Sequence, residues 1–358
     1  MYLNFFLNLL ILFLTLINVF KCRLLNIKKA NYFIIKNNKD LIDPRSIKFT
    51  NLNKKKLSNS INFVRSPSYI LSLKALFKLK NIIILSSVHG FIFKKNKKLK
   101  KKTNLSNKEY ISAITSIVKF LKINQFKMID DYRVMPLFLP ILDKLNITSI
   151  GFMHGRISSK LKYQKNLKLY KFDKYYVWNK YFKKKILDIN RKYVDNEIYI
   201  KNPLKKYLLR KINQTQGLFL ISEDNVSNDT YLKIINKLKK QKKFKIYFKF
   251  RPNNILDQNL IKILKKNNIQ YFHKENIYKL FLKHNIKLLF AFNSSLLIES
   301  SFYNIIPVMI FNKNLNIKEY LEDNLVFGCK INQLSNIFNY LGKMDEKLKI
   351  IKINNWGN

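Results

Sequence analysis

The sequence contains little glycine, cysteine, alanine or acidic residue for its length. Its 358 residues include 7 Gly and 2 Cys, whereas average usage would give about 25 glycines. The two cysteines, Cys22 and Cys329, are far apart, and no Cys-x-x-Cys pair or His/Cys cluster occurs. A disulfide framework and a structural zinc site are therefore excluded.

Several common catalytic motifs are absent as well. The chain has no G-x-G-x-x-G, no Walker A sequence, no G-x-S-x-G and no H-E-x-x-H. Each of these motifs brings glycines, a nucleophile or metal ligands into a fixed local geometry. A common dehydrogenase, a P-loop nucleotidase, an α/β-hydrolase and a zinc protease therefore lack support, and we expect no metal site.

Basic residues outnumber acidic ones by 69 to 21, which gives a formal net charge of +48. The excess is dominated by lysine and spread along the chain, and Asn, Ile, Phe and Tyr are enriched with it. These residues have A/T-rich codons, so an A/T-rich genome explains much of the charge. A non-enzymatic polyanion-binding protein remains an alternative. Because arginine is not clustered and no basic motif is interleaved with aromatic residues, we expect no nucleic-acid partner.

The chain is nevertheless rich enough in apolar residues to fold. Hydrophobic residues make up 47% and aromatic residues 14% of it, which excludes intrinsic disorder. Residues 3–20 form a nearly continuous apolar run, whose helical length of about 27 Å is just short of the ~30 Å bilayer core. No basic residue precedes the run and no small-residue cleavage site follows it, which argues against a signal peptide.

Basic residues follow this run directly, at Lys21, Arg23, Lys28 and Lys29. We therefore expect residues 1–30 to be a hydrophobic, membrane-associated helix with a basic flank. It would either span the membrane marginally or lie in its surface, and the basic flank would keep the rest of the protein on the cytoplasmic side. A buried first helix of the fold is the alternative.

Beyond residue 30, short apolar runs alternate with amphipathic stretches, as in βα units. One series of such units occupies residues 31–170 and a second occupies residues 171–358. We therefore predict an α/β fold, with two doubly wound Rossmann-like domains that face each other across a cleft. In sheets of this kind, ligands bind beyond the carboxyl ends of the strands.

The scarce residue types fall where the predicted strands end. Lys249 and Arg251 are two apart at the end of a strand and followed by Pro252, so their side chains share a face and could clamp a diphosphate. Asn293, Ser294 and Ser295 join a strand to a helix, whose backbone N–H groups and hydroxyls would suit a phosphate. Glu299, one turn further on, could accept hydrogen bonds from a ribose.

A second group of scarce residues follows two strands of the first series. His154, Gly155 and Arg156 come directly after the predicted strand of residues 147–153, and Asp131 and Arg133 come after the strand of residues 126–130. His154 or Asp131 could act as a general base, and Gly155 would allow close approach of the backbone.

The order of these motifs resembles that of bacterial GT-B-fold glycosyltransferases of capsule and surface-polysaccharide synthesis. These include relatives of the polysialyl- and Kdo-transferases and the CDP-glycerol glycerophosphotransferases. The likeness covers roughly residues 31–345. The segments that carry it are MIDDYR (128–133), ITSIGFMHGR (147–156), YVWNKYFKKKIL (176–187), IYIKNPL (198–204), KFRP (249–252), NSSLLIES (293–300) and IIPVMIF (305–311).

The resemblance implies roles for the candidate residues. Lys249, Arg251 and Pro252 match a Lys-x-His-Pro-like donor motif, in which Arg251 replaces the usual His. Ser294, Ser295 and Glu299 match the serine motif near the donor phosphate and the acidic residue after it. His154 and Gly155 match the His-Gly at the cleft, with the acceptor on the side of Arg156 and Arg133. Ile306 stands where a Gly often precedes the proline.

The activity implied is transfer of a sugar from a nucleotide-activated donor to a surface polysaccharide or lipid-linked glycan. The enzyme would need no metal and no cofactor beyond the nucleotide-sugar co-substrate, and would work at the cytoplasmic face of a bacterial inner membrane. A CDP-glycerol-type glycerophosphotransferase and a nucleotide-sugar epimerase of related architecture are the enzymatic alternatives.

Overall fold

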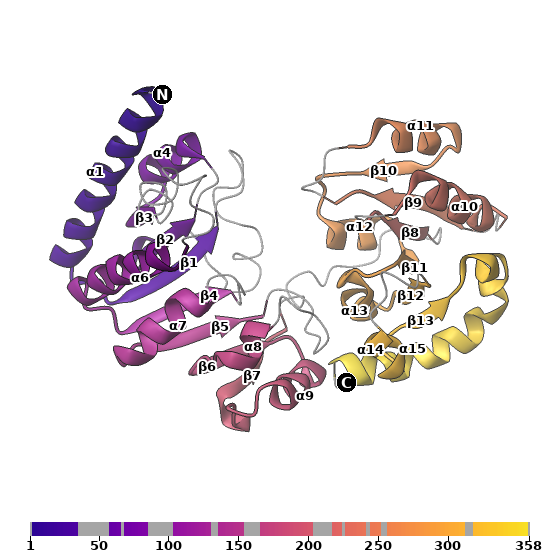
Figure 1. Cartoon of the computed structure of the whole chain (residues 1–358). Coiled ribbons are helices and arrows are strands. Elements are labelled where there is room, and N and C mark those ends of the chain that lie inside the picture. The colour runs from indigo at the N-terminus through magenta and orange to yellow at the C-terminus, as the bar shows by residue number, and fades with distance from the viewer. Residues whose placement is uncertain are drawn as a thin grey trace. The chain divides into compact units, whose positions relative to one another are not determined.

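The computed structural model describes most of the chain in two compact units (Figure 1). The first consists of Met1–Trp178 with Phe182–Lys201, and the second of Asn179–Tyr181 with Asn202–Asn358. The described residues are 2–34, 57–65, 68–84, 103–129, 135–153, 165–202, 217–223, 226–240, 244–251, 256–311 and 318–356.

The first unit is built on a parallel sheet of seven strands in the order β3-β2-β1-β4-β5-β6-β7. The strands are β1 (Lys29–Ile34), β2 (Ile61–Arg65), β3 (Ile82–Ile84), β4 (Gln125–Ile129), β5 (Thr148–Phe152), β6 (Lys174–Val177) and β7 (Ile198–Ile200). The helices are α1 (Tyr2–Leu24), α4 (Tyr69–Lys78), α6 (Thr103–Phe120), α7 (Met135–Lys144), α8 (Lys165–Leu169) and α9 (Lys180–Ile189).

The second unit has a parallel sheet of six strands in the order β10-β9-β8-β11-β12-β13. The strands are β8 (Gly217–Ile221), β9 (Lys245–Lys249), β10 (Gln270–Phe272), β11 (Ile286–Ala291), β12 (Ile306–Ile310) and β13 (Phe327–Cys329). The helices are α10 (Asn228–Leu238), α11 (Gln258–Lys266), α12 (Ile277–Lys283), α13 (Leu296–Ser301), α14 (Lys318–Glu322) and α15 (Leu341–Trp356).

The boundary between the units differs from the predicted one at residue 170. Strands β6 and β7 pair in sequence onto β5, so they complete the first sheet rather than open the second. The local alternation of strands and helices does not show which sheet a strand joins, so the pairing of β6 and β7 sets this boundary rather than the sequence pattern. The expectation that the two domains face each other across a cleft stays a prediction.

Both sheets reverse their strand order beside the first strand, between β1 and β4 and between β8 and β11. Such a reversal is the topological switch point of a doubly wound fold, where the loops at the carboxyl ends part to opposite faces and leave a crevice. The fold therefore marks one edge of each sheet as the place for a ligand.

The core of the second unit follows from its continuous apolar strands. All five residues of β8 are buried, as expected of a strand covered on both faces. Leu218 and Leu220 pack with α10, α11 and the C-terminal helical region. Phe219 points to the other face, where its ring meets that of Phe281 on α12 at 5.9 Å. These two apolar layers hold the strand ends in place.

Asparagine ends many of the helices. Among the described residues, eight non-glycine residues have a positive φ, and all except Lys122 are asparagine: Asn26, Asn81, Asn146, Asn268, Asn285, Asn304 and Asn324. After α11, Asn268 N donates to Lys265 O and Ile269 N donates to Leu264 O, which is the Schellman pattern that a glycine usually completes. Asparagine tolerates this left-handed backbone better than other side chains, so a glycine-poor chain can still end its helices.

Helix α1 is part of the first unit rather than a separate segment. Ile11, Thr15, Val19 and Cys22 are buried, and Asn18 Nδ2 donates to Ile82 O of β3 at 3.1 Å. This face matches the alternative of a buried first helix. Of the helices that the structure describes, none is long and apolar enough to cross a membrane, so the marginal span expected over residues 3–20 is not supported.

Candidate functional site

The best-defined cluster of polar side chains in the second unit lies at the carboxyl ends of β8, β9 and β11. These strands are neighbours in the parallel sheet, so the residues that follow them emerge at the same edge. Glu223 follows β8, Arg251 follows β9, and the turn of residues 293–295 follows β11. The β8–β11 pair is the switch point of this sheet, so the cluster lies where the topology favours a ligand.

Glu223 joins the three strand ends with one carboxylate. Its Oε1 accepts hydrogen bonds from the backbone N–H groups of Phe292 at 3.0 Å and Asn293 at 2.7 Å. Its Oε2 lies 3.4 Å from Nη2 of Arg251. The side chain is buried, and a buried carboxylate is stable only when its oxygens are paired in this way.

Glu223 was not among the residues predicted from the sequence. Its partners Phe292 and Asn293 are 69 and 70 residues away along the chain, so no local motif connects them. The available signal was an acidic residue, in a chain with only 21 of them, placed directly after a buried strand.

Arg251 is held by its backbone and remains partly exposed. Its N–H donates to Ser222 Oγ at 3.0 Å, which fixes the end of β9 to the end of β8. Its side chain is 38% exposed, so the guanidinium borders both Glu223 and solvent. A guanidinium held in this position can pair with a phosphate or carboxylate ligand. Pro252 lies outside the described residues.

Lys249 occupies a different environment from Arg251. Only 4% of it is exposed, and its ammonium donates to Phe250 O at 2.8 Å and His273 O at 2.6 Å. Burial lowers the pKa of Lys249 from 10.5 to about 8, against the opposing effect of the Glu275 carboxylate. The structure thus gives this lysine a role in joining the ends of β9 and β10, and its direct contact with a phosphate stays a prediction.

The turn after β11 brings two half-buried serines to the same edge. Ser294 Oγ accepts a hydrogen bond from Leu296 N at 3.2 Å. Ser295 Oγ instead donates to Glu299 Oε1 at 2.9 Å. Because a serine hydroxyl has a single hydrogen, this bond commits the Ser295 hydrogen to Glu299, and the two serines are not equivalent donors.

Glu299 lies beneath this turn, in α13. It is 3% exposed, and its Oε2 accepts a hydrogen bond from the hydroxyl of Tyr278 on α12. The carboxylate therefore positions Ser295 and anchors α12 to α13. Tyr278 was not identified from the sequence. Acceptance of a ribose by Glu299 remains a prediction.

The predicted residues of the first unit lie outside the described residues. They are Asp131, Arg133, His154, Gly155 and Arg156. The strands that precede them, β4 and β5, are adjacent and parallel, with Ile129 opposite Phe152. The two strands therefore end side by side, and the catalytic and acceptor-side roles of the residues after them stay predictions.

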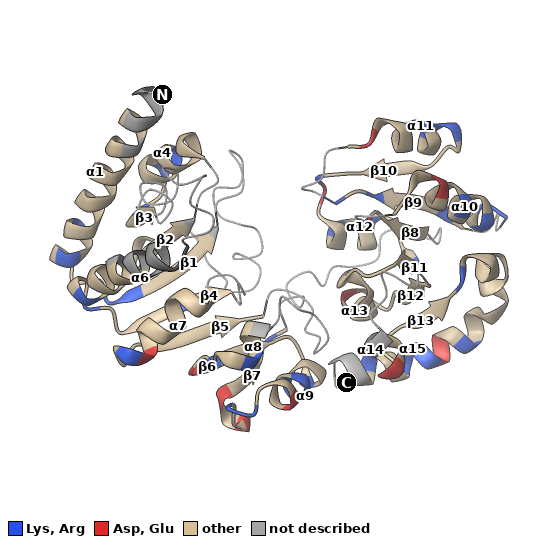
Figure 2. Cartoon of the chain, in the orientation of Figure 1, with Lys and Arg blue, Asp and Glu red and all other residues tan. Residues whose placement is uncertain are grey.

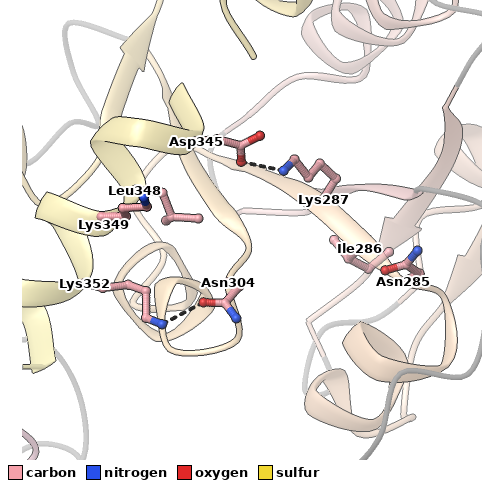
Figure 3. A pocket seen from close by; sticks show the side chains of 8 residues that line it. All are labelled: Asn285, Ile286, Lys287, Asn304, Asp345, Leu348, Lys349 and Lys352. Carbon is pink, nitrogen blue, oxygen red and sulfur yellow. Dashed lines mark hydrogen bonds and ion pairs between the residues drawn. The ribbon is translucent and has the colours of Figure 1, made fainter. Parts of the chain in front are cut away.

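A pocket of about 470 Å³ lies at the opposite edge of the second sheet, at the start of β11 (Figure 3). Lys287 pairs there with Asp345, and Lys352 donates to Asn304 Oδ1 (Figure 3). The amino ends of parallel strands are remote from the crevice at the switch point, where ligands bind. This pocket is therefore not the candidate site. The pocket is lined by Asn285, Ile286, Lys287, Asn304, Asp345, Leu348, Lys349 and Lys352.

In the described part of the chain, no group of three or more His, Cys, Asp or Glu residues could hold a metal ion.

Solved structures resemble the chain over nearly its whole length. The UDP-GlcNAc 2-epimerase from Neisseria meningitidis, solved with UDP-GlcNAc bound, matches with a TM-score of 0.58 at 12% identity, over 92% of this chain and 96% of the epimerase. The lipopolysaccharide outer core galactosyltransferase WaaB, in its apo form, matches with a TM-score of 0.54 at 11% identity, over 92% of this chain and 95% of WaaB. The fold is of the GT-B type.

The calicheamicin glycosyltransferase CalG4 has the same fold, with a TM-score of 0.55 at 8% identity, over 91% of this chain and 94% of CalG4. No protein-family model matches the sequence, and a search of curated protein sequences finds no match either. The predicted two-domain α/β fold is thus confirmed, whereas the narrower likeness to the polysialyl- and Kdo-transferases stays a prediction.

Proposed function

We propose that the protein is a glycosyltransferase that moves a sugar from a nucleotide-activated donor to a growing surface polysaccharide or lipid-linked glycan. The observation that carries the proposal is the cluster of Glu223, Arg251 and Ser294 at the switch point of the second sheet. A cationic group and hydroxyls at this edge suit the diphosphate of a nucleotide sugar. Support also comes from the GT-B fold, which the chain shares with two glycosyltransferases.

In the proposed reaction, the donor phosphates lie against Arg251 and the turn of residues 293–295. As the bond between the sugar and the phosphate breaks, negative charge develops on the leaving nucleotide, and Arg251 stabilises that charge. His154 or Asp131 takes the proton from the acceptor hydroxyl. We propose no metal in this reaction, and we place the enzyme at the cytoplasmic face of a bacterial inner membrane.

A thermal-shift screen against CMP-, UDP-, GDP- and CDP-linked donors tests the proposal first. We expect one class of donor to raise the melting temperature, because a ligand that binds only the folded state stabilises it. The double variant Arg251→Ala with Ser294→Ala should lose this shift. Lys349→Ala, in the pocket at the opposite edge, is the matched control. Nucleotide binding and turnover that survive the double substitution would show that the site is assigned wrongly.

A nucleotide-sugar epimerase is the second candidate, because the epimerase from N. meningitidis has the same fold. The two activities differ in their need for an acceptor. An epimerase converts its nucleotide sugar when no acceptor is present, whereas a glycosyltransferase releases nucleotide in step with a glycosylated acceptor. A CDP-glycerol-type glycerophosphotransferase would release CMP and add glycerol phosphate to the product, so identification of both products separates the three.

A further inference from the structure

Helix α1 carries two apolar faces on opposite sides. One face holds Ile11, Val19 and Cys22 and is buried against the first unit. At about 100° per residue, the exposed apolar side chains of the other face form one continuous row from Phe6 to Leu24. The exposure of its members is high, with Phe13 61% exposed and Leu24 87% exposed. The row consists of Phe6, Leu9, Phe13, Leu16, Ile17, Phe20 and Leu24; we call it the outer row.

Basic side chains surround the C-terminal end of the outer row. By the helical geometry, Lys21 and Arg23 lie on either side of it, and the exposed Lys28 and Lys29 follow. Figure 2 shows that the described part of α1 is free of charged residues until this end. The first acidic residue of the sequence is Asp40. The positive charge at this end therefore has no acidic neighbour along the chain.

The row continues onto α6. The ring of Phe120, at the end of α6, meets Phe20 edge-on at 5.5 Å, and the Arg23 guanidinium lies 5.8 Å from the centre of the same ring. Lys119 and Lys122 are exposed beside it. Apolar rings and basic groups thus meet at one end of the surface, the combination that binds the interface of an anionic bilayer.

We propose that the outer row of α1 lies flat in the surface of an anionic membrane, with its side chains at the boundary of headgroups and acyl chains. Because Ile11, Val19 and Cys22 remain in the core, the helix must lie parallel to the membrane rather than cross it. The inference deepens the membrane location in the proposed function and names the surface that makes the contact. Lys21, Arg23, Lys28 and Lys29 bind the lipid phosphates.

Charge complementarity selects the membrane over a second copy of the chain. Two chains that each carry a net charge of +48 repel one another, whereas an anionic bilayer attracts them. Exposed apolar rows of this length otherwise promote association. The row therefore suits a partner that is both apolar and negatively charged.

The test measures flotation of the full chain with vesicles of phosphatidylcholine alone and of phosphatidylcholine mixed with phosphatidylglycerol. We expect binding to the mixed vesicles that weakens as salt is added. Phe6→Gln with Phe13→Gln should reduce binding about tenfold or more for each ring removed. Lys21→Gln with Lys28→Gln should reduce the preference for phosphatidylglycerol, because two of the four basic groups after the outer row are removed, and leave the outer row intact.

The control removes two exposed apolar side chains from another surface. Ile350→Gln with Ile353→Gln on α15 changes side chains that are 54% and 56% exposed, and should bind vesicles like the wild type. Circular dichroism and melting temperature check that each variant is folded. Two outcomes would overturn the proposal. In the first, neither α1 variant changes vesicle binding. In the second, the wild type binds no vesicles but self-associates, and the Phe variant abolishes that self-association. Because no sugar transfer is measured, failure here is distinct from failure of the glycosyltransferase assignment.

Discussion

Glu223 illustrates how one buried side chain can organise a site that is spread along the chain. Its two oxygens receive donors of different kinds, the N–H groups of Phe292 and Asn293 on one side and Arg251 on the other. All three of these partners are hydrogen-bond donors. Glu223 therefore accepts hydrogen bonds at both of its oxygens in these contacts, a pattern that suits a carboxylate.

We expect Glu223→Gln to impair the site although the side chain keeps its size. The amide nitrogen of glutamine brings hydrogens toward either the backbone N–H groups or Arg251, and one of these partners loses its acceptor. The unfolding free energy should fall by about 1–3 kcal/mol, and nucleotide affinity should fall with it. Urea unfolding and calorimetric titration measure the two effects. Glu346→Gln, an exposed acid on α15, is the control, and an equal effect there would contradict the role of Glu223.

The two serines of the β11–α13 turn should respond differently to replacement. Ser295 has committed its hydrogen to Glu299, whereas the hydrogen bond described for Ser294 Oγ uses it as an acceptor. We therefore expect Ser294→Ala to weaken nucleotide binding about tenfold, as for loss of one hydrogen bond to a charged group. Ser295→Ala should mainly lower the unfolding free energy. The reverse pattern in titration and unfolding would assign the phosphate to Ser295.

Lys249 should make stability depend on alkaline pH. Burial lowers its pKa in the folded protein to about 8, below the ordinary value of 10.5. Below about pH 8 the lysine is charged in both states. Between the two pKa values, Lys249 is protonated in the unfolded chain and largely neutral in the folded protein. The contribution of Lys249 to the unfolding free energy therefore rises with pH. The difference in unfolding free energy between wild type and Lys249→Met should therefore increase from pH 8 to pH 10.5, and a flat difference would contradict the lowered pKa.

At the scale of elements, the asparagine ends of the helices give a direct test. Asn268 follows α11 with a φ of 53°. An alanine there keeps the left-handed strain without the local hydrogen bonding of asparagine, so Asn268→Ala should cost about 1 kcal/mol of unfolding free energy. Asn268→Gly should be neutral or slightly stabilising, because glycine adopts this backbone freely. Urea unfolding of both variants measures this, and equal loss in the two would show that the asparagine side chain itself stabilises the turn.

Most strands of both sheets were predictable because a strand buried on both faces is a short apolar run between polar residues. Strand β2 (Ile61–Arg65) was missed. Its Asn62 is buried and donates to the carbonyls of Leu57, Ser60 and Lys80, so a polar residue interrupts the apolar run. Helix α15 was not predicted either. The strands β6 and β7 were predicted as strands but assigned to the second domain, because the local pattern of a strand does not show which strand it pairs with.

The candidate site was predictable in part for a similar reason. Arg251, Asn293 and Ser294 could be identified because each follows a strand, and the ends of parallel strands meet at one edge. Glu223 and Tyr278 act through residues that are distant in the sequence. The burial of Lys249 depends on β10 and on the carbonyl of His273. Such contacts exist only once the sheet is assembled, so a strand-by-strand analysis could not find them.

At the scale of the whole molecule, the net charge of +48 affects stability more than it affects fold. Lysine and arginine are spread over both units (Figure 2), and so many like charges repel one another in the compact state. Salt shortens the range of this repulsion, from about 30 Å at 0.01 M to about 8 Å at 0.15 M. We expect the melting temperature to rise over this range of sodium chloride. A fall would indicate that attractive ion pairs outweigh the repulsion.

The asparagines at the helix ends have a consequence for how the protein can change over evolutionary time. Glycine is normally hard to lose from a fold, because the turns that need a left-handed backbone collapse without it. In the part of this chain that the structure describes, seven such turns already use asparagine. Mutational drift toward lysine and asparagine can therefore alter most of the surface while the two sheets and their switch points persist, which is consistent with a GT-B fold that survives at 8–12% identity to its structural relatives.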